Sequence, residues 1–189
     1  MSEKNNDVNN VTAGKPKVGG AVFRAKLGTE LPTDATTPLN AAFENMGYIS
    51  EDGVTLTTER ETEAIKAWGG DTVANLSKGQ SETYKLTFIE ALRDTVLKSV
   101  RGDENVSGTL SEGLTVKSKN FEDEGHIYVI EQILRGGVAM RTVILNGKIT
   151  EIDDTTYADD GLIGYGVTIA CEPNDKGEFH HEYYKGAAA

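Results

Sequence analysis

Glycine-centred turn signals recur along the second half of this chain and divide it into short segments that read as strands. Turns about 8–12 residues apart are typical of antiparallel sandwiches and barrels. The sequence therefore predicts a mainly β (α+β) fold, an antiparallel β-sandwich or barrel with one flanking helix. In the second half we first expect a hairpin over residues 106–117, with its turn near Ser111-Glu112-Gly113. Strands at residues 127–134 and 138–145 should follow around a turn at Arg135-Gly136-Gly137, and a type I′ turn at Asn146-Gly147 should lead into a strand at residues 148–152. Residues 163–171 and 178–184 are expected to form the last strand pair.

The single predicted helix spans about residues 89–101. Its expected core residues recur at helical spacing: Ile89, Leu92, Val96 and Val100. Thr87 and Glu90 have the spacing of a capping box, and Gly102 stands where the helix would end. We expect this apolar stripe to pack on a sheet, so that Leu92→Asp would unfold the domain.

Residues 48–68 are expected to form a long hairpin. Asp52-Gly53 is a strong hairpin signal because glycine accepts positive φ, and it predicts a turn at residues 51–53. Residues 59–63 are interpreted as a charged tip, and Gly69-Gly70 ends the last strand of this region. An irregular stretch at residues 28–46 is long enough to be functional as well.

The termini lack periodic patterns. Residues 1–18 are polar and are interpreted as a flexible arm, either without a role or ordered on a neighbouring subunit. Residues 19–185 are expected to form a single β-sandwich domain, followed by a tail at residues 186–189. The first ten residues have no apolar segment typical of a secretory signal.

The charge of the chain limits its function. The formal net charge is -11, which disfavours non-specific binding to nucleic acid by phosphate neutralisation. No stretch approaches the roughly 20 apolar residues that span a bilayer. Cys171 is the only cysteine, so no disulfide forms within the chain and a cytosolic folding compartment is expected.

The sequence predicts no catalytic, cofactor or metal site, and we expect no enzyme. His180 and His181 are adjacent in a strand, so their rings point to opposite faces and cannot share a metal ion. The acidic run at residues 151–160 lacks the ligand spacing of a calcium loop. Cys171 lies in an apolar run and fits a core position, and Trp68 fits partly buried packing better than a ligand platform.

The order of several segments resembles the major tail proteins of long-tailed (siphovirus) phages of Gram-positive bacteria, which are tail tube proteins. The matching segments are residues 47–54, 67–71, 88–92, 101–106 and 164–169. The resemblance implies a sandwich or barrel with one flanking helix, related to the type VI secretion tube protein. It also implies hexameric rings that stack through a long hairpin or loop and through terminal arms, in a tube that conducts DNA into the host.

The resemblance, together with the charge and the hairpin signals, points to two sets of site residues. The ring-stacking candidates are Tyr48, Glu51, Asp52, Glu59, Arg60, Glu61 and Trp68, with the irregular stretch at residues 28–46 as the competing candidate for this contact. The acidic residues expected to face a lumen and repel DNA are Glu122, Asp123, Glu124, Glu131 and Asp153.

Expected partners are further copies of the chain, a tape measure protein, a tail terminator, a distal tail protein, and double-stranded DNA that passes without specific binding. No membrane partner is expected. The expected location is the phage tail, after synthesis in the host cytoplasm. The alternative is a β-sandwich module that binds carbohydrate or decorates a capsid.

Overall fold

Antiparallel strands dominate the regular structure of the computed structural model, which describes residues 6–186, and α1 (Asp94–Arg101) is the one α-helix in that range. This confirms the predicted fold class. The strands are β1 (Gly14–Pro16), β2 (Val22–Lys26), β3 (Glu44–Asn45), β4 (Ile49–Lys66), β5 (Thr72–Phe88), β6 (Val106–Thr109), β7 (Gly113–Val116), β8 (His126–Leu134), β9 (Ala139–Ile152), β10 (Tyr165–Cys171) and β11 (His180–Lys185). Short 3₁₀ turns lie at Val8–Asn10, Asp103–Asn105 and Arg135–Gly137.

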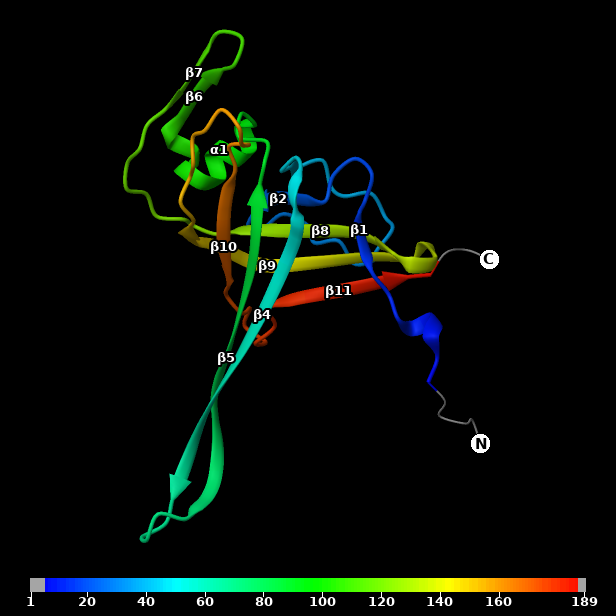
Figure 1. The fold of residues 1–189 in the computed structure, drawn as a ribbon, viewed down its shortest axis with the longest axis vertical. Coiled ribbons are helices and arrows are strands. Elements are labelled where there is room, and N and C mark those ends of the chain that lie inside the picture. The colour runs from blue at the N-terminus through cyan, green and yellow to red at the C-terminus, as the bar shows by residue number, and fades with distance from the viewer. Residues whose placement is uncertain (1–5, 187–189) are drawn as a thin grey trace.

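One sheet joins nine of these strands in the order β3-β2-β8-β9-β10-β5-β4, with β1 also on β8 and β11 also on β9. Strand β9 connects the two halves of the sheet. One of its edges pairs with β8, and the other pairs with β11 along residues 139–144 and with β10 along residues 147–152. In Figure 1, β8, β9 and β11 run across the direction of β10, β5 and β4, so the sheet encloses a core.

The main core lies between these two sets of strands and is closed by α1. Its fully buried side chains include Val22 from β2, Ile144 from β9, Phe88 from β5, Val167 from β10 and Val96 from α1. Each such aliphatic or aromatic group contributes about 1.5–3 kcal/mol when it leaves water. The apolar face of the helix therefore packs on the sheet, as the sequence predicted.

A second apolar cluster covers the opposite face of β2, β8 and β9. Val129 and Val143 are fully buried there, beneath Phe43, Leu31 and Leu39 from the irregular stretch at residues 28–46. Strand β8 is consequently buried on both faces, which explains its nearly continuous apolar sequence. Much of the irregular stretch thus packs on its own subunit.

The helix is shorter than the sequence predicts, and the predictions for Ile89, Leu92 and the capping box are wrong. It begins at Asp94, after Arg93, whose backbone is extended (φ -74°, ψ 127°). Its last residue is Arg101, and the capping residue Gly102 donates its N–H to Lys98 O over 2.8 Å. Val96 and Val100 are buried as predicted, whereas Ile89 and Leu92 both precede the helix; Ile89 is half-buried and Leu92 is 67% exposed. Glu90 is not a capping residue of the helix either, because its carboxylate accepts hydrogen bonds from Tyr48 N and Arg93 Nε.

Three predicted turns or pairings are also wrong. Gly53 lies in an irregularity inside β4, and Asn146-Gly147 lies inside β9, so neither makes a hairpin. A Cβ at Gly147 would lie 2.7 Å from Ile169 and 2.9 Å from Tyr128, which explains the glycine by packing. Strands β10 and β11 both pair with β9 and not with each other. The hairpins β6–β7 and β8–β9 are confirmed.

Part of the expected N-terminal arm is paired with the body. Residues 14–16 form β1 against β8, and Lys17 Nζ donates to Glu131 Oε2 over 2.8 Å. Residues 1–5 of that arm and residues 187–189 of the expected tail lie outside the described residues.

Candidate assembly interface

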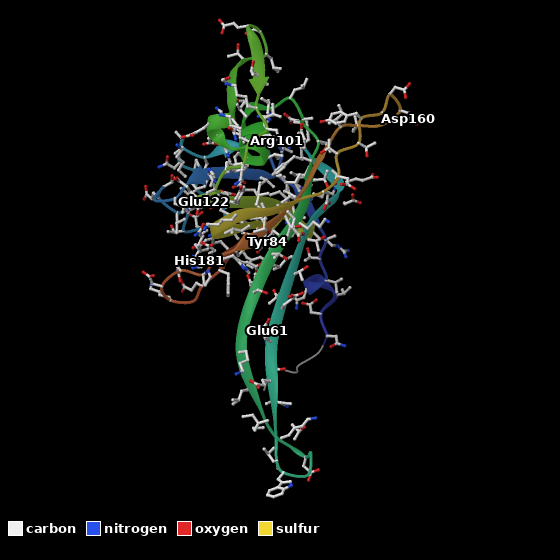
Figure 2. The ribbon with its side chains drawn as sticks, turned by 90° about the vertical axis from the view of Figure 1, so that its left-hand side faces the viewer. Glu61, Tyr84, Arg101, Glu122, Asp160 and His181 are labelled. Atoms are coloured by element: carbon white, nitrogen blue, oxygen red, sulfur yellow. The ribbon has the colours of Figure 1, made fainter. Side chains whose placement is uncertain are left out.

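The most prominent feature of the molecule is the hairpin formed by β4 and β5, which projects far from the body (Figure 1, Figure 2). The two strands pair from Val54 with Leu86 to Lys66 with Thr72, and residues 67–71 form the tip. At the tip, Ala67 N donates to Asp71 O over 2.8 Å and Gly70 N to Ala67 O over 3.0 Å. The inner end of β5 is anchored by the buried side chains Tyr84, Leu86 and Phe88.

Outside its anchored end, the hairpin has no core. Every residue from Thr55 to Ser81 is exposed. A two-stranded ribbon without a packed face is only marginally stable in water, and its outer edges carry unpaired backbone groups. The subunit's own fold therefore leaves this arm without the contacts that would stabilise it.

Apolar side chains gather near the end of the arm. Ile65 is 41% exposed, Val73 62%, Leu76 47%, and Trp68 at the tip is fully exposed. The inner shaft is polar instead, with Glu59, Arg60 and Glu61 in β4. Figure 2 shows Glu61 part of the way along the arm. The arm thus ends in an apolar surface, here called the tip surface, made of Ile65, Trp68, Val73 and Leu76.

The structure distributes the predicted stacking residues along the whole hairpin. Tyr48, Glu51 and Asp52 lie at its base, while Glu59, Arg60 and Glu61 lie in the shaft. The predicted charged tip at residues 59–63 is therefore wrong, because the strands continue to residues 66 and 72. Sequence reasoning missed Val73 and Leu76 because residues 72–82 were not recognised as strand, although the Gly69-Gly70 turn signal preceded them.

A polar network holds the base of the hairpin against the helix. Glu90 accepts from Tyr48 N over 2.9 Å, and Ile89 N donates to Tyr48 O over 3.1 Å. The hydrogen bond from Arg93, with that from Tyr48 N, lowers the pKa of Glu90. Thr95 Oγ1 donates to Asn45 O over 2.9 Å, so the first turn of α1 binds the segment that enters β4.

Where the hairpin leaves the body, Glu82 is buried and lies 2.6 Å from His180 Nδ1 on β11. The His180 ring packs edge-on against Tyr84, whose pKa is raised by burial. His181 instead contacts Tyr183 and Glu178, so the two histidines diverge as the strand geometry predicted. These contacts fix the exit of the arm.

The acidic residues assigned to a lumen lie in different surroundings. Glu131 is buried and bonds to Arg141 and Lys17, so its assignment as a lumen-facing charge is wrong. Asp123 accepts from Gly125 N and Ile149 N, and Asp153 pairs with Lys85 at 3.0 Å. Glu122 and Glu124 are exposed.

Other residues that could carry chemistry have structural roles. Burial raises the pKa of Cys171 to about 12, with a smaller contribution from the Glu82 charge, so its thiol is not activated. Within residues 6–186, no three His, Cys, Asp or Glu side chains are grouped so that they could hold a metal ion. No helix in that part of the chain has the length and apolar character needed to cross a membrane.

The antiparallel sheet places the chain among the mainly β-proteins, and its hairpin exposes a long two-stranded surface. A family model described as phage tail tube protein matches residues 3–181. The chain therefore belongs to the phage tail tube protein family and has a structural role in the virion tail. No curated protein sequence gives a significant match.

Proposed function

We propose that this chain assembles into rings and that these rings stack into a tube that conducts double-stranded DNA into the host. The resemblance to siphovirus major tail proteins favours six subunits in each ring. The tube of a siphovirus tail would enclose a tape measure protein and end at a tail terminator and a distal tail protein. The chain would be made in the host cytoplasm and act without enzymatic activity. Residues 19–185 would form the wall, and the N-terminal arm would add contacts between subunits.

The exposed β4–β5 hairpin is the observation that carries this proposal. An arm whose residues 55–81 are all exposed gains stability only from another chain. A contact between this arm and a different surface of a second copy is heterologous, and such contacts close into rings or continue as helical stacks. In the proposal, the ring-stacking residues are those of the hairpin, with Trp68 at its end.

A shortened hairpin tests the proposal directly. Residues 62–78 are replaced by Asn-Gly, which joins Glu61 to its cross-strand partner Gly79 and keeps the register of the shaft. Because the core is untouched, we expect a folded subunit that forms no tubes by negative-stain microscopy at concentrations where the wild type does. Shortening the exposed turn at residues 174–177 is the matched control and should leave tubes intact. Long tubes from the hairpin variant would contradict the stacking role, and a wild-type monomer at high concentration would contradict the tube.

The conduit is tested separately, through charge. Glu122 and Glu124 are the exposed members of the proposed lumen set. An acidic wall repels phosphates, so Glu122→Lys with Glu124→Lys should slow DNA ejection while tubes still form. The control reverses two exposed acids elsewhere, Glu30→Lys with Asp175→Lys. Normal ejection kinetics in the first variant would refute the lumen assignment.

A further inference from the structure

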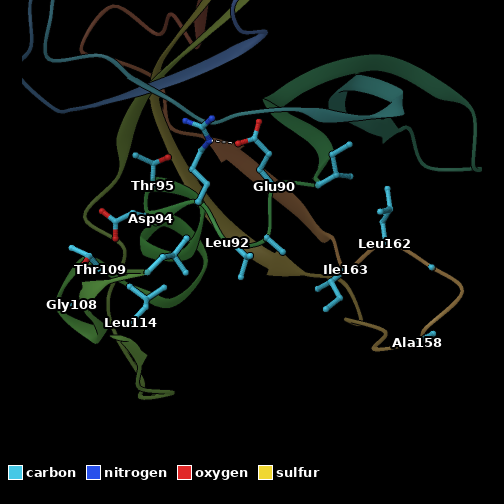
Figure 3. A pocket seen from close by; sticks show the side chains of 15 residues that line it. Glu90, Leu92, Asp94, Thr95, Gly108, Thr109, Leu114, Ala158, Leu162 and Ile163 are labelled. Atoms are coloured by element: carbon cyan, nitrogen blue, oxygen red, sulfur yellow. Dashed lines mark hydrogen bonds and ion pairs between the residues drawn. The ribbon is translucent and has the colours of Figure 1, made fainter. Parts of the chain in front are cut away.

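An open groove of about 1010 Å³ lies at the end of the body opposite the hairpin tip (Figure 3). Three segments line it: the turn before α1, the β6–β7 hairpin, and the loop that precedes β10. Its apolar side chains are Ile89, Leu92, Leu110, Leu114, Leu162 and Ile163, here called the leucine groove.

The leucine groove is apolar but uncovered. Leu92 is 67% exposed, Leu110 62% and Leu162 81%. Leucines at such exposure are ordinary when scattered, whereas several that line one concave surface mark a contact site. Leu92 belongs to neither of the two buried apolar clusters of its own subunit.

The tip surface offers a matching occupant. It projects one indole and three aliphatic side chains from the end of a ribbon that is two strands wide. An aromatic side chain buries about 150–250 Å² in a complementary pocket, and tryptophan is among the residue types enriched at the energetic centres of interfaces. Both surfaces are apolar, one is convex and the other concave, and neither is covered within the subunit.

The charges near the two surfaces leave the contact open. Lys78 is paired with Glu63 in the hairpin, so Lys66 and Asp71 are the remaining charges between Ala64 and Lys78. At the groove, Asp94 is paired with Lys98, and Asp159 and Asp160 flank the groove in the loop before β10. Figure 2 shows Asp160 at the far end of the molecule from the hairpin tip. Lys66 of one copy and this acidic loop of the next carry opposite charges, which favour one register between the two surfaces.

The two surfaces lie at opposite ends of the long axis of the molecule (Figure 1). A hairpin cannot reach the groove of its own body, so the contact must join two copies. A surface that meets a different surface on the next copy can repeat without limit along an axis.

We propose that the tip surface of one subunit inserts into the leucine groove of a second subunit, with Trp68 among Leu92, Leu114 and Leu162. This rests on the proposed stacking function and identifies the receptor for the hairpin. The contact leaves the fold of each subunit unchanged, since both surfaces are already exposed.

Site-directed cross-linking tests the contact without removing its anchors. Asp71→Cys places a thiol beside the tip, and Gly161→Cys places one in the groove, where a Cβ meets no atom within 4 Å. Cys171 is buried and stays unreactive. Tubes grown from a mixture of the two variants and treated with a short bis-maleimide should yield covalent dimers. Mixtures of Asp71→Cys with Asp175→Cys should not.

An alternative occupant of the groove is the N-terminal arm of a neighbouring subunit. Tubes grown from a mixture of Asn6→Cys and Gly161→Cys test this alternative. Cross-linking of Gly161→Cys to the arm but not to Asp71→Cys would overturn the proposal. Intact tubes in which Asp71→Cys forms no cross-link to Gly161→Cys or to Asn6→Cys would also overturn the proposal. In both cases the tube itself would still form, so the proposed function would stand.

Point variants give a second measurement. Leu162→Asp and Trp68→Asp should each raise the critical concentration for tube growth about tenfold or more, the factor for losing one interface anchor. Leu27→Asp, on an exposed leucine away from both surfaces, should have no such effect. Growth of the Leu162→Asp variant at the wild-type concentration would refute the groove contact. Failure of the wild type to form tubes would instead refute the function on which the contact rests.

Discussion

Arg141 on β9 and Glu131 on β8 face each other across the strand pair, both buried, with Arg141 Nε 3.0 Å from Glu131 Oε1. The same guanidinium donates to Asp34 O over 2.7 Å and to Thr37 O over 2.9 Å. Arg141 therefore binds the irregular stretch at residues 28–46 to the sheet. One ion pair organises the surface layer that covers the second apolar cluster.

Removing the cation from this pair should strongly destabilise the subunit. Arg141→Met leaves Glu131 buried with only Lys17 as a charged partner and frees two backbone carbonyls, so we expect a loss of about 3–5 kcal/mol in the free energy of unfolding. Urea unfolding of the subunit measures it. Arg60→Met, on the exposed hairpin, is the control and should change it by less than about 0.5 kcal/mol. Equal midpoints for the two variants would contradict the anchoring role.

Aspartate substitutions should separate the two ends of the helical region. Leu92→Asp should remain folded because Leu92 is 67% exposed, whereas Val96→Asp should unfold because Val96 is fully buried and its replacement would carry an unpaired charge. Circular dichroism and size-exclusion chromatography distinguish these outcomes. An unfolded Leu92→Asp variant would restore the sequence-based prediction of a longer helix.

Two glycines with positive φ should differ in their sensitivity to alanine. Gly47 (φ 79°) would place a Cβ 2.5 Å from the Glu90 carboxyl carbon, whereas Gly53 (φ 73°) has no atom within 4 Å of that position. Both variants pay about 1–2 kcal/mol for the left-handed backbone. Gly47→Ala should lose about 1–3 kcal/mol more, because it displaces the Glu90–Arg93 pair at the base of the hairpin. Chemical denaturation compares them, and equal losses would show that the pair moves aside freely.

Asp123 should contribute stability that disappears in acid. Burial acts to raise its pKa, but the nearby His126, at 3.6 Å, and hydrogen bonds from Gly125 N and Ile149 N outweigh it and hold the pKa below the ordinary value of an aspartate. A carboxyl with a depressed folded pKa stabilises the fold fully above its unfolded pKa, and this contribution is lost as the pH falls through the folded pKa.

The variant Asp123→Asn should thus be less stable than wild type near neutral pH, by about 1–3 kcal/mol. The difference should shrink as the pH falls below about 4. Unfolding midpoints across the pH range measure this, with Asp175→Asn in an exposed turn as the control. A difference independent of pH would show that the carboxylate charge is not what matters.

Local signals in the sequence were sufficient for the parts of the fold that depend on local geometry. The β6–β7 and β8–β9 hairpins were predicted correctly because their glycine turns join neighbouring strands. Val96 and Val100 were identified because helical spacing places them on one face of α1. The family followed from the order of these signals and is confirmed by the match over residues 3–181.

What the sequence could not predict depends on contacts between distant segments. Asp52-Gly53 suits a hairpin and a bulge equally, and only the long pairing of β4 with β5 decides for the bulge. Helical spacing extends back to Ile89, yet the bond between Glu90 and Tyr48 N holds the preceding residues out of the helix. Nothing local in the sequence distinguishes Glu131 from the surface acids, because its burial depends on Arg141, which lies opposite it on the neighbouring strand.

The hairpin also separates two kinds of constraint on this sequence. No side chain from Thr55 to Ser81 is buried by its own subunit, so changes there are almost invisible to any measurement of the isolated chain's stability. Variants in that segment would express, purify and unfold like the wild type. Their defects would appear only in assembly. A screen for folded protein would therefore accept sequences that cannot be incorporated into a growing particle.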